Sequence, residues 1–303
     1  MGKLFLTGGS GFIGGNLVTI AARSDWEVTA AWNTNRPDIE GVEWVQLDFT
    51  DEKAVMQAIS DTKPDAVIHL GAISGIDLCE TDQASADSVN VKGTANVRQA
   101  AFENDARLVV ISTDNVFDGE RGNYGEEDEA SPVNYYGQTK LNAERETLEH
   151  YSAALVVRIP LVLGFTRTGS GSSINGLIRT IRENGLLWFL TDEIRTPIDA
   201  ITLSEALLEL ADSDMQGVIH VAGTERVSRA DIGMLLLKKL GLPEDRASYL
   251  SGMVPGADER AMRPKDISLD VTRASLIIQT QLLGFQESMD RIWEYARPED
   301  TAI

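Results

Sequence analysis

The sequence predicts an α/β protein with a doubly wound parallel sheet and a smaller C-terminal lobe. Short apolar segments alternate with amphipathic segments through the first half of the 303-residue chain, as strands and helices do in such a sheet. The first apolar segment runs directly into a glycine-rich turn, Thr7-Gly8-Gly9-Ser10-Gly11-Phe12-Ile13-Gly14. Hydrophobic residues make up 43% of the chain, which is enough for a sizeable buried core.

The elements of the first half follow from the spacing of apolar residues. Strands are expected at residues 3–7, 27–32, 42–47, 66–70, 107–111 and 154–159, and helices at 11–23, 52–60, 85–102 and 132–150. Strands separated by helices favour right-handed crossovers, and therefore a parallel sheet. Ser131-Pro132 predicts the start of the fourth helix, because a capping hydroxyl is followed by proline at the first helical position.

The alternation becomes less regular after Gly164. Residues 174–184 carry an apolar helix face that ends at Asn184-Gly185. Further helices are expected at 203–211, 229–240, 272–279 and 287–296, with a strand at 218–221. We expect one domain over residues 1–162 and a lobe made mainly of residues 163–303, with 197–222 packing back onto the first domain.

Charge and cysteine content exclude several kinds of partner. The chain has 27 Lys and Arg against 47 Asp and Glu, a net charge of −20, which disfavours nucleic acid and anionic membrane surfaces. Its single cysteine, Cys79, allows no intrachain disulfide, and no paired cysteines suggest a metal site. No apolar run reaches membrane-spanning length. We therefore expect a cytoplasmic protein without a metal.

The glycine-rich turn is typical of a dinucleotide-binding site. Glycines allow a tight turn and a close approach to pyrophosphate, and the following helix offers free amides. Two registers fit, since either Gly8 or Gly9 can precede Gly11 and Gly14. The expected cofactor contacts are Gly8, Gly11, Phe12, Ile13 and Gly14. The alternative is a glycine-rich turn without a ligand, but its strand–turn–helix context favours a dinucleotide-binding domain over residues 1–162.

The end of the second strand favours NADP over NAD. NAD-binding sites often carry an acidic residue there, whereas residues 31–36 read Ala-Trp-Asn-Thr-Asn-Arg. Arg36 can pair with a 2′-phosphate and Asn33 can hydrogen-bond to it, so NADPH is expected to be preferred over NADH. The alternative is that Arg36 is an ordinary solvated loop residue.

Two other strand ends predict cofactor contacts. Asp48 follows the third strand, where it can accept from the adenine amino group or, alternatively, cap the helix that starts near Asp51. Gly71 and Ala72 follow the fourth strand, and their small size admits a close approach of the cofactor.

Tyr136 and Lys140 are candidates for acid–base chemistry. Residues four apart share one face of a helix, so both side chains can point into one cleft. A tyrosine has a pKa of about 10, and a nearby cation lowers it. Thr113 lies in Ile111-Ser112-Thr113-Asp114 at the carboxyl end of the fifth strand, where its hydroxyl can bind a substrate carbonyl. By itself the Tyr-x-x-x-Lys pattern is also compatible with a surface pair.

With these residues in place, the chain resembles the extended short-chain dehydrogenases/reductases, and more narrowly the dTDP-4-dehydrorhamnose reductase family. The resemblance spans nearly the whole chain. The glycine turn and Tyr136-Gly137-Gln138-Thr139-Lys140 are shared by the superfamily. Two further segments point to the narrower family: Ser112-Thr113-Asp114-Asn115-Val116-Phe117-Asp118-Gly119 and Arg263-Pro264-Lys265-Asp266-Ile267-Ser268-Leu269-Asp270.

The resemblance implies a Rossmann sheet and a set of catalytic roles. Thr113 would bind the substrate carbonyl and Tyr136 would donate the proton. Lys140 would hold the nicotinamide ribose and lower the pKa of Tyr136. Asn90 would support a proton-relay water beside the lysine, unless it is a solvent-facing helix residue.

The resemblance also implies a substrate site in the C-terminal lobe. Arg263 would meet a nucleotide diphosphate, with a salt bridge to Asp266 or Asp270 as the alternative, and Arg195 is a second candidate. Asn115 stands where family members usually carry tyrosine, which suggests a different acceptor sugar.

The implied function is NADPH-dependent reduction of the 4-keto group of a nucleotide-linked deoxysugar, an oxidoreductase reaction of the kind used in dTDP-rhamnose biosynthesis. Whether the protein forms a homodimer also stays open. Two alternatives also stay open: an NAD-dependent nucleotide-sugar epimerase, and a non-catalytic NADP-binding regulatory subunit similar to that of methionine adenosyltransferase.

Overall fold

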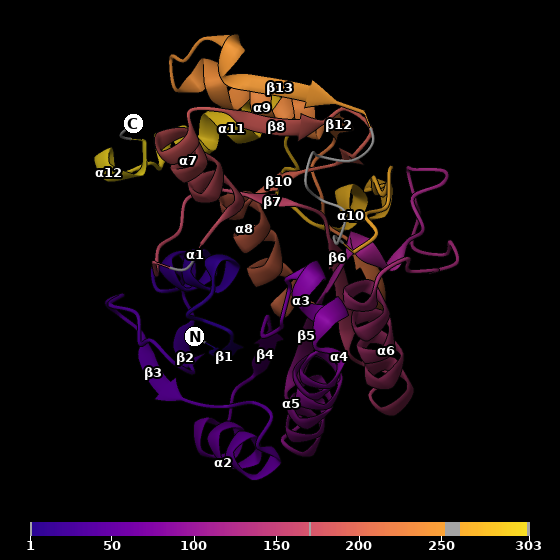
Figure 1. Cartoon of the computed structure of the whole chain (residues 1–303). Coiled ribbons are helices and arrows are strands. Elements are labelled where there is room, and N and C mark those ends of the chain that lie inside the picture. Colours follow the sequence, from indigo (N-terminus) through magenta and orange to yellow (C-terminus); the bar gives the residue numbers. More distant parts are fainter. Residues whose placement is uncertain (1, 170, 252–260, 302–303) are drawn as a thin grey trace.

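A computed structural model of the chain describes residues 2–169, 171–251 and 261–301. Its centre is a seven-stranded sheet, in the order β11-β6-β5-β4-β1-β2-β3, in which every neighbouring pair is parallel (Figure 1). This arrangement confirms the predicted fold class. The strands are β1 (Lys3–Thr7), β2 (Glu27–Trp32), β3 (Glu43–Gln46), β4 (Ala66–His69), β5 (Arg107–Thr113), β6 (Leu155–Ile159) and β11 (Gly217–His220).

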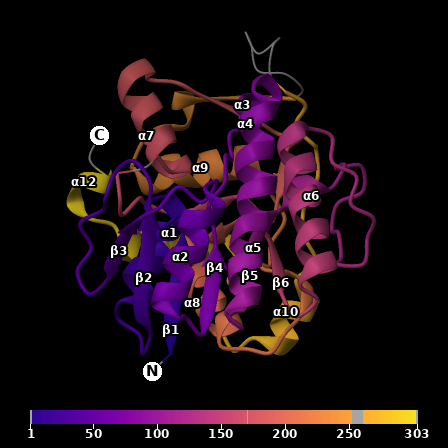
Figure 2. The same cartoon turned by 90° about the horizontal axis from the view of Figure 1, so that it is seen from below.

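Helices cover both faces of the sheet. On one face lie α1 (Phe12–Ala21) and α8 (Ala200–Ala211), which pack against each other. On the other face lie α2 (Glu52–Thr62), α5 (Gly93–Glu103) and α6 (Tyr135–His150), side by side in Figure 2. The strands are therefore buried on both sides, which explains why they read as continuous apolar runs.

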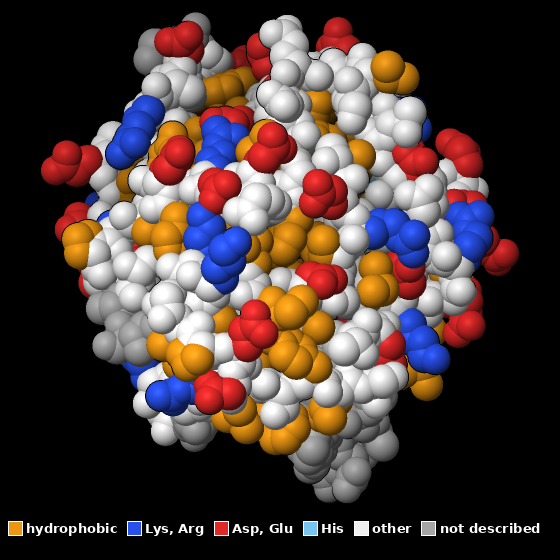
Figure 3. All heavy atoms as spheres, turned by 90° about the horizontal axis from the view of Figure 1, so that it is seen from above, with side chains coloured by type: hydrophobic (Ala, Val, Ile, Leu, Met, Phe, Trp, Pro, Cys, Tyr) orange, Lys and Arg blue, Asp and Glu red, His pale blue; other side chains and the backbone are white. Residues whose placement is uncertain are grey.

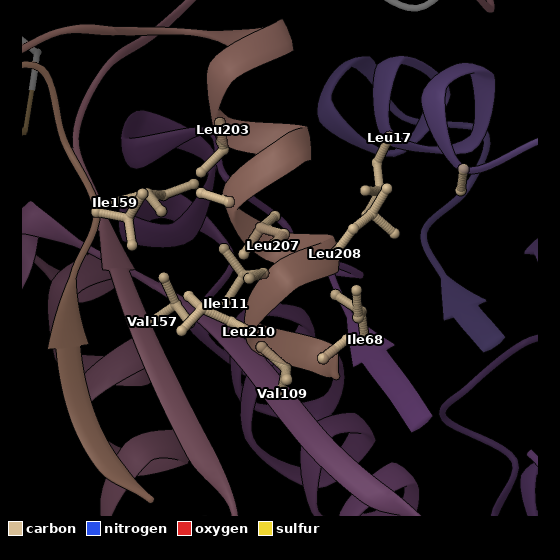
Figure 4. Close-up of a cluster of buried hydrophobic side chains, with 14 of the residues drawn as sticks. Leu17, Ile68, Val109, Ile111, Val157, Ile159, Leu203, Leu207, Leu208 and Leu210 are labelled. Carbon is tan, nitrogen blue, oxygen red and sulfur yellow. The ribbon is translucent and has the colours of Figure 1, made fainter. Parts of the chain in front are cut away.

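Helix α8 joins the second half of the chain to the sheet. Figure 4 shows its leucines lying over the side chains of β5 and β6, and all of them are buried. Burying one such side chain stabilises the fold by about 1.5–3 kcal/mol. Strand β11 forms the edge of the sheet beside β6. Helix α8 and strand β11, which both follow residue 197, therefore complete the sheet and one of its helix layers. The labelled cluster is Leu17, Ile68, Val109, Ile111, Val157, Ile159, Leu203, Leu207, Leu208 and Leu210.

Most of the remaining elements form a smaller lobe over the carboxyl end of the sheet, whereas α10 (Thr272–Ile277) packs against β11 and adds Ala274 to the core of the sheet. Within the described residues the lobe holds three two-stranded sheets, β10-β7, β12-β9 and β13-β8, none of which was expected from the sequence. Helix α7 ends at Gly185, whose φ of 70° is left-handed, as the Asn184-Gly185 pair predicts. The elements are β7 (Val162–Leu163), α7 (Ser173–Asn184), β8 (Leu187–Leu190), β9 (Ile194–Arg195), β10 (Ile198–Asp199), β12 (Val227–Ser228), α9 (Arg229–Lys239), η3 (Glu244–Arg246), β13 (Ala247–Leu250), α10 (Thr272–Ile277), α11 (Phe285–Glu294) and α12 (Pro298–Thr301).

The fourth helix starts later than predicted. It begins at Tyr135, and the side chain of Asn134 caps it by accepting a hydrogen bond from the Gly137 amide at 2.9 Å. The prediction of a start at Ser131-Pro132 was therefore wrong. Asn134 has an extended backbone, and an asparagine side chain satisfies the free amides of a first turn as well as serine does.

The segment predicted as one helix over residues 85–102 is interrupted. It consists of α4 (Gln83–Ala86), a π-helical turn η1 (Asp87–Lys92) and α5, and it is preceded by an unexpected short helix α3 (Ile76–Thr81). π-turns occur frequently at functional sites, because they displace side chains from the regular helix face. Here the turn carries Asn90.

The outer surface of the C-terminal lobe mixes both signs of charge. Acidic and basic side chains are scattered among each other on the face seen in Figure 3. The helices within the described ranges are all too short or too polar to cross a membrane.

Candidate active site

The turn between β1 and α1 brings backbone segments very close together. Gly8 has a left-handed φ of 70°, and a Cβ at position 14 would lie 2.1 Å from the Gly8 carbonyl oxygen. Only glycine fits at position 14. Among the described residues, the amides of Phe12, Ile13 and Gly14 have no hydrogen-bond partner, and the first turn holds no acidic residue. The turn thus presents free donors and the positive end of a helix dipole.

A cleft of about 480 Å³ lies between this turn, the carboxyl ends of the strands and the smaller lobe. Its volume lies within the range of ligand-binding pockets. The predicted site residues that line it come from both parts of the chain. They are Gly8, Gly11, Phe12, Ile13, Gly14, Ala72, Thr113, Tyr136, Lys140, Arg195 and Arg263.

Thr113 and Tyr136 face each other in this cleft. Burial raises the pKa of the Tyr136 hydroxyl above its usual value, and a hydrogen bond with the Thr113 side chain opposes that rise. Among the described residues, the charge of Lys140 is not one of the groups that move this pKa. Tyr136 is therefore protonated at neutral pH, as a proton donor must be. The idea that Lys140 lowers its pKa stays a prediction.

Lys140 is a buried cation without a protein partner. Its side chain is 3% exposed, and no hydrogen bond or ion pair joins its ammonium to the described residues. Burial lowers the pKa of Lys140 to about 8, with the carboxylate of Glu144 acting in the opposite direction. An ammonium of this kind has three donors available to a ligand in the cleft.

Asn90 is fully buried, so the alternative of a solvent-facing residue was wrong. Its amide nitrogen donates to the Ile73 carbonyl and to the Thr139 hydroxyl, each at 3.0 Å, and its amide oxygen accepts from the Ile73 amide at 2.8 Å. Asn90 thus ties the loop after β4 to α6, next to Lys140. Whether it also supports a proton relay stays a prediction.

The two arginines predicted for the substrate have different surroundings. Arg263 pairs with Asp77 at 2.7 Å rather than with Asp266 or Asp270, because the fold brings α3 to this side of the cleft. Arg195 is 5% exposed and donates to the carbonyls of Pro264 and Lys265. Arg263 therefore keeps more capacity for a ligand than Arg195 does.

Four predicted cofactor residues do not line the cleft. Gly71 is buried, and its Cα faces the Phe49 ring, which a Cβ would meet at 2.4 Å. Asp48 is exposed and accepts from the amide and hydroxyl of Thr50, whereas Asp51 caps α2. Asn33 and Arg36 lie exposed in the loop after β2, and within the described ranges the Arg36 guanidinium has no ion pair.

Three charged residues of this site were not predicted from the sequence. Asp114, Glu193 and Arg229 all line the cleft. Burial raises the pKa of Asp114 to about 6, although Arg195 lies 3.8 Å from its Oδ2. The position of Asp114 directly after Thr113 was the only available signal.

A buried ion pair between Arg158 and Glu144 lies beside the end of β5. Arg158 of β6 makes hydrogen bonds of 2.7–3.2 Å to both oxygens of Glu144 on α6, and Ser112 donates to the same carboxylate. These contacts hold α6 against the end of β5. The helix that carries Tyr136 and Lys140 is thereby placed beside Thr113.

Comparisons with known proteins agree with this geometry. The model of the RmlD substrate binding domain matches residues 2–297. The probable low-salt glycan biosynthesis reductase Agl14 of Haloferax volcanii is 30% identical over 88% of this chain and 89% of its own length. Methionine adenosyltransferase 2 subunit beta of Danio rerio is 26% identical over 97% of this chain and 91% of its own length.

A solved structure has the same fold. The dTDP-4-dehydrorhamnose reductase from Bacillus anthracis, in complex with NADP, superposes with a TM-score of 0.85 at 22% identity, covering 97% of this chain and 99% of that one. The chain belongs to the RmlD substrate binding domain family, which confirms the predicted resemblance to the dTDP-4-dehydrorhamnose reductases.

Proposed function

We propose that this protein reduces the 4-keto group of a nucleotide-linked deoxysugar with NADPH. The observation that carries the proposal is the grouping of Thr113, Tyr136 and an unpaired Lys140 in one cleft with the free amides of α1. The reductases among its relatives support this reaction class.

The residues present fit a dinucleotide. Gly8 and Gly14 carry no side chains, so the tight turn leaves its backbone open to a pyrophosphate. The amides of Phe12 and Ile13 supply hydrogen-bond donors to it. Lys140 would hold the nicotinamide ribose hydroxyls. Arg36 and Asn33 would meet the 2′-phosphate from the loop after β2.

The side chains of the cleft supply the remaining chemistry. NADPH, when bound, supplies the hydride for the carbonyl carbon. The carbonyl π electrons move to the oxygen, where Thr113 and Tyr136 stabilise the developing negative charge. Tyr136 then transfers its proton to that oxygen, so the product is an alcohol.

A panel of nucleotide-linked 4-keto-6-deoxysugars tests the proposal. The loss of NADPH absorbance is followed with and without each sugar. Steady oxidation that depends on one of them is expected. No net oxidation, with interconversion of two sugars, would instead indicate an epimerase, because an epimerase returns the hydride.

A second candidate is a regulatory subunit, favoured by the similarity to methionine adenosyltransferase 2 subunit beta. Such a protein would bind NADP and turn over no sugar. Tight NADP binding, together with no NADPH oxidation in the presence of any sugar of the panel, would favour this candidate over the reductase.

Replacing Arg36 by alanine is expected to weaken NADPH binding by about ten- to a hundredfold and to leave NADH binding nearly unchanged. A charge-assisted hydrogen bond contributes about 1.5–3 kcal/mol, and NADH has no 2′-phosphate. Fluorescence titration of both cofactors measures the effect. Arg145→Ala is the control, since it removes the same charge from an exposed position on α6 away from the cleft. An unchanged preference in the Arg36 variant would refute this role.

Replacing Arg263 by alanine is expected to raise KM for the nucleotide sugar about tenfold while the Kd for NADPH stays nearly constant, because a diphosphate would lose paired donors. Asp77→Asn provides the contrast: it releases Arg263 from its ion pair, so KM is expected to fall or stay level. A normal KM in the arginine variant would contradict diphosphate recognition, and a collapsed Tm would show that the ion pair is structural.

A further inference from the structure

Asn115 lies where the end of β5 meets the first turn of α6. A Cβ at position 137 would lie 2.1 Å from the Asn115 carbonyl oxygen, so glycine at 137 lets α6 rest on the Asn115 backbone. The Asn115 side chain also lines the cleft. Asn115 therefore contacts both the helix of Tyr136 and the strand end of Thr113.

The helix cap determines which way the Asn115 amide points. The oxygen of Asn134 accepts from the Gly137 amide, so the nitrogen of Asn134 faces outward, 3.2 Å from the Met262 carbonyl and 3.5 Å from the oxygen of Asn115. The Asn115 nitrogen must then face the strand end. There it donates to Oδ1 of Asp114 at 2.9 Å and to Oγ1 of Thr113 at 3.3 Å.

Thr113 is left with a single role in hydrogen bonding. Its hydroxyl oxygen also accepts from the Asn115 backbone amide at 3.2 Å. A threonine hydroxyl has two acceptor lone pairs and one proton, so Asn115 fills both lone pairs. The hydroxyl can then only donate. A carbonyl oxygen that gains negative charge requires such a donor.

Asp114 is the competing acceptor for that proton. The Thr113 hydroxyl donates to its Oδ1 at 3.1 Å, and the Asn115 nitrogen donates to the same oxygen at 2.9 Å. Oδ2 is buried and has no hydrogen-bond partner among the described residues. Because the shorter bond from Asn115 already supplies Oδ1 with a donor, it weakens the hold of Asp114 on the Thr113 proton, which can then be donated to a carbonyl oxygen in the cleft.

We propose that Asn115 is a positioning residue, which keeps the Thr113 hydroxyl a donor toward the sugar carbonyl. Through its oxygen, Asn115 also connects Thr113 to Asn134, the residue that caps the helix of Tyr136. This inference rests on the proposed reductase function. The tyrosine usual at this position in the family has one O–H, which cannot donate to Thr113 and Asp114 together.

Asn115→Asp tests the proposal, because it keeps the shape and replaces the donor by an acceptor. We expect kcat at about pH 8 to fall by about 10²- to 10³-fold, as when one oxyanion donor is lost, with the Kd for NADPH changed by less than about twofold. The loss should shrink toward about pH 5.5, where the added carboxyl beside Asp114 gains a proton. Asn142→Asp is the control, because it adds the same charge to α6 outside the cleft and its oxygen still accepts from Gln138.

A measurement without turnover tests the contact itself. In urea unfolding at several pH values, the stability of Asn115→Asp relative to the parent should fall as pH rises from about 5 to about 8, since neighbouring carboxylates raise each other's pKa in the folded state. A pH-independent difference would overturn the contact. An unchanged kcat, or a loss confined to KM, would overturn the positioning role. A parent that reduces no sugar would refute the reductase function instead, and the unfolding data would still judge the contact.

Discussion

Replacing Tyr136 by phenylalanine is expected to lower kcat by about 10²- to 10⁴-fold while NADPH binding and the fold stay intact. The substitution removes only the hydroxyl that donates the proton, and general acid catalysis contributes a factor of this size. Steady-state kinetics with the sugar found in the panel, together with NADPH titration, measures both effects.

Tyr135 offers a matched control for this experiment. It precedes Tyr136 on the same helix, but its hydroxyl donates to Asp87 at 2.8 Å and it does not line the cleft. Tyr135→Phe makes the same chemical change outside the site, so its kcat should remain close to that of the parent. If Tyr136→Phe also kept the parent rate, another residue would have to be the acid.

Replacing Lys140 by methionine is expected to weaken NADPH binding and lower kcat, yet to stabilise the folded protein at neutral pH. The first two effects follow from the loss of the ammonium that would hold the ribose. The third follows from burial, which lowers the pKa of Lys140 to about 8 from the usual 10.5. That difference corresponds to about 3 kcal/mol of cost for keeping the charge buried below pH 8.

The pH dependence of stability distinguishes this explanation from a simple change in packing. Between about pH 8 and pH 10.5 the unfolded chain binds more protons at Lys140 than the folded chain does, so the parent should gain stability as pH rises through this window. The methionine variant has no such group and should lack this gain. Urea unfolding at about pH 7 and pH 10 measures it. Equal gains in both proteins, or a less stable variant at neutral pH, would contradict a charged, buried Lys140.

Local features of the chain were sufficient for much of the fold. The glycine turn, the six strands of the first half and the end of α7 at Gly185 depend on backbone conformation and apolar period, and both are properties of short segments. The structure confirms these elements. The spacing of Tyr136 and Lys140 on one helix face likewise needed only four residues of sequence.

Helix boundaries were less predictable, because competing caps lie close together. Both Ser131-Pro132 and Asn134 can start a helix, and the packing of Gly137 against Asn115 favours the second. The π-turn around Asn90 has no local signal either. It places the amide of Asn90 against Ile73 and Thr139, which are distant in sequence.

The parallel sheet, the glycine-rich turn and the pair of Tyr136 and Lys140 on one helix face could thus be predicted from short segments of the chain. The pairing of polar groups could be seen only in the folded chain: Arg263 with Asp77, Asp114 with Arg195, and Asn115 with Thr113. The difference lies in the sequence distance over which each interaction acts. Period and turn chemistry act over a few residues, whereas a hydrogen bond in the cleft depends on where separate strands, helices and the second lobe place their ends.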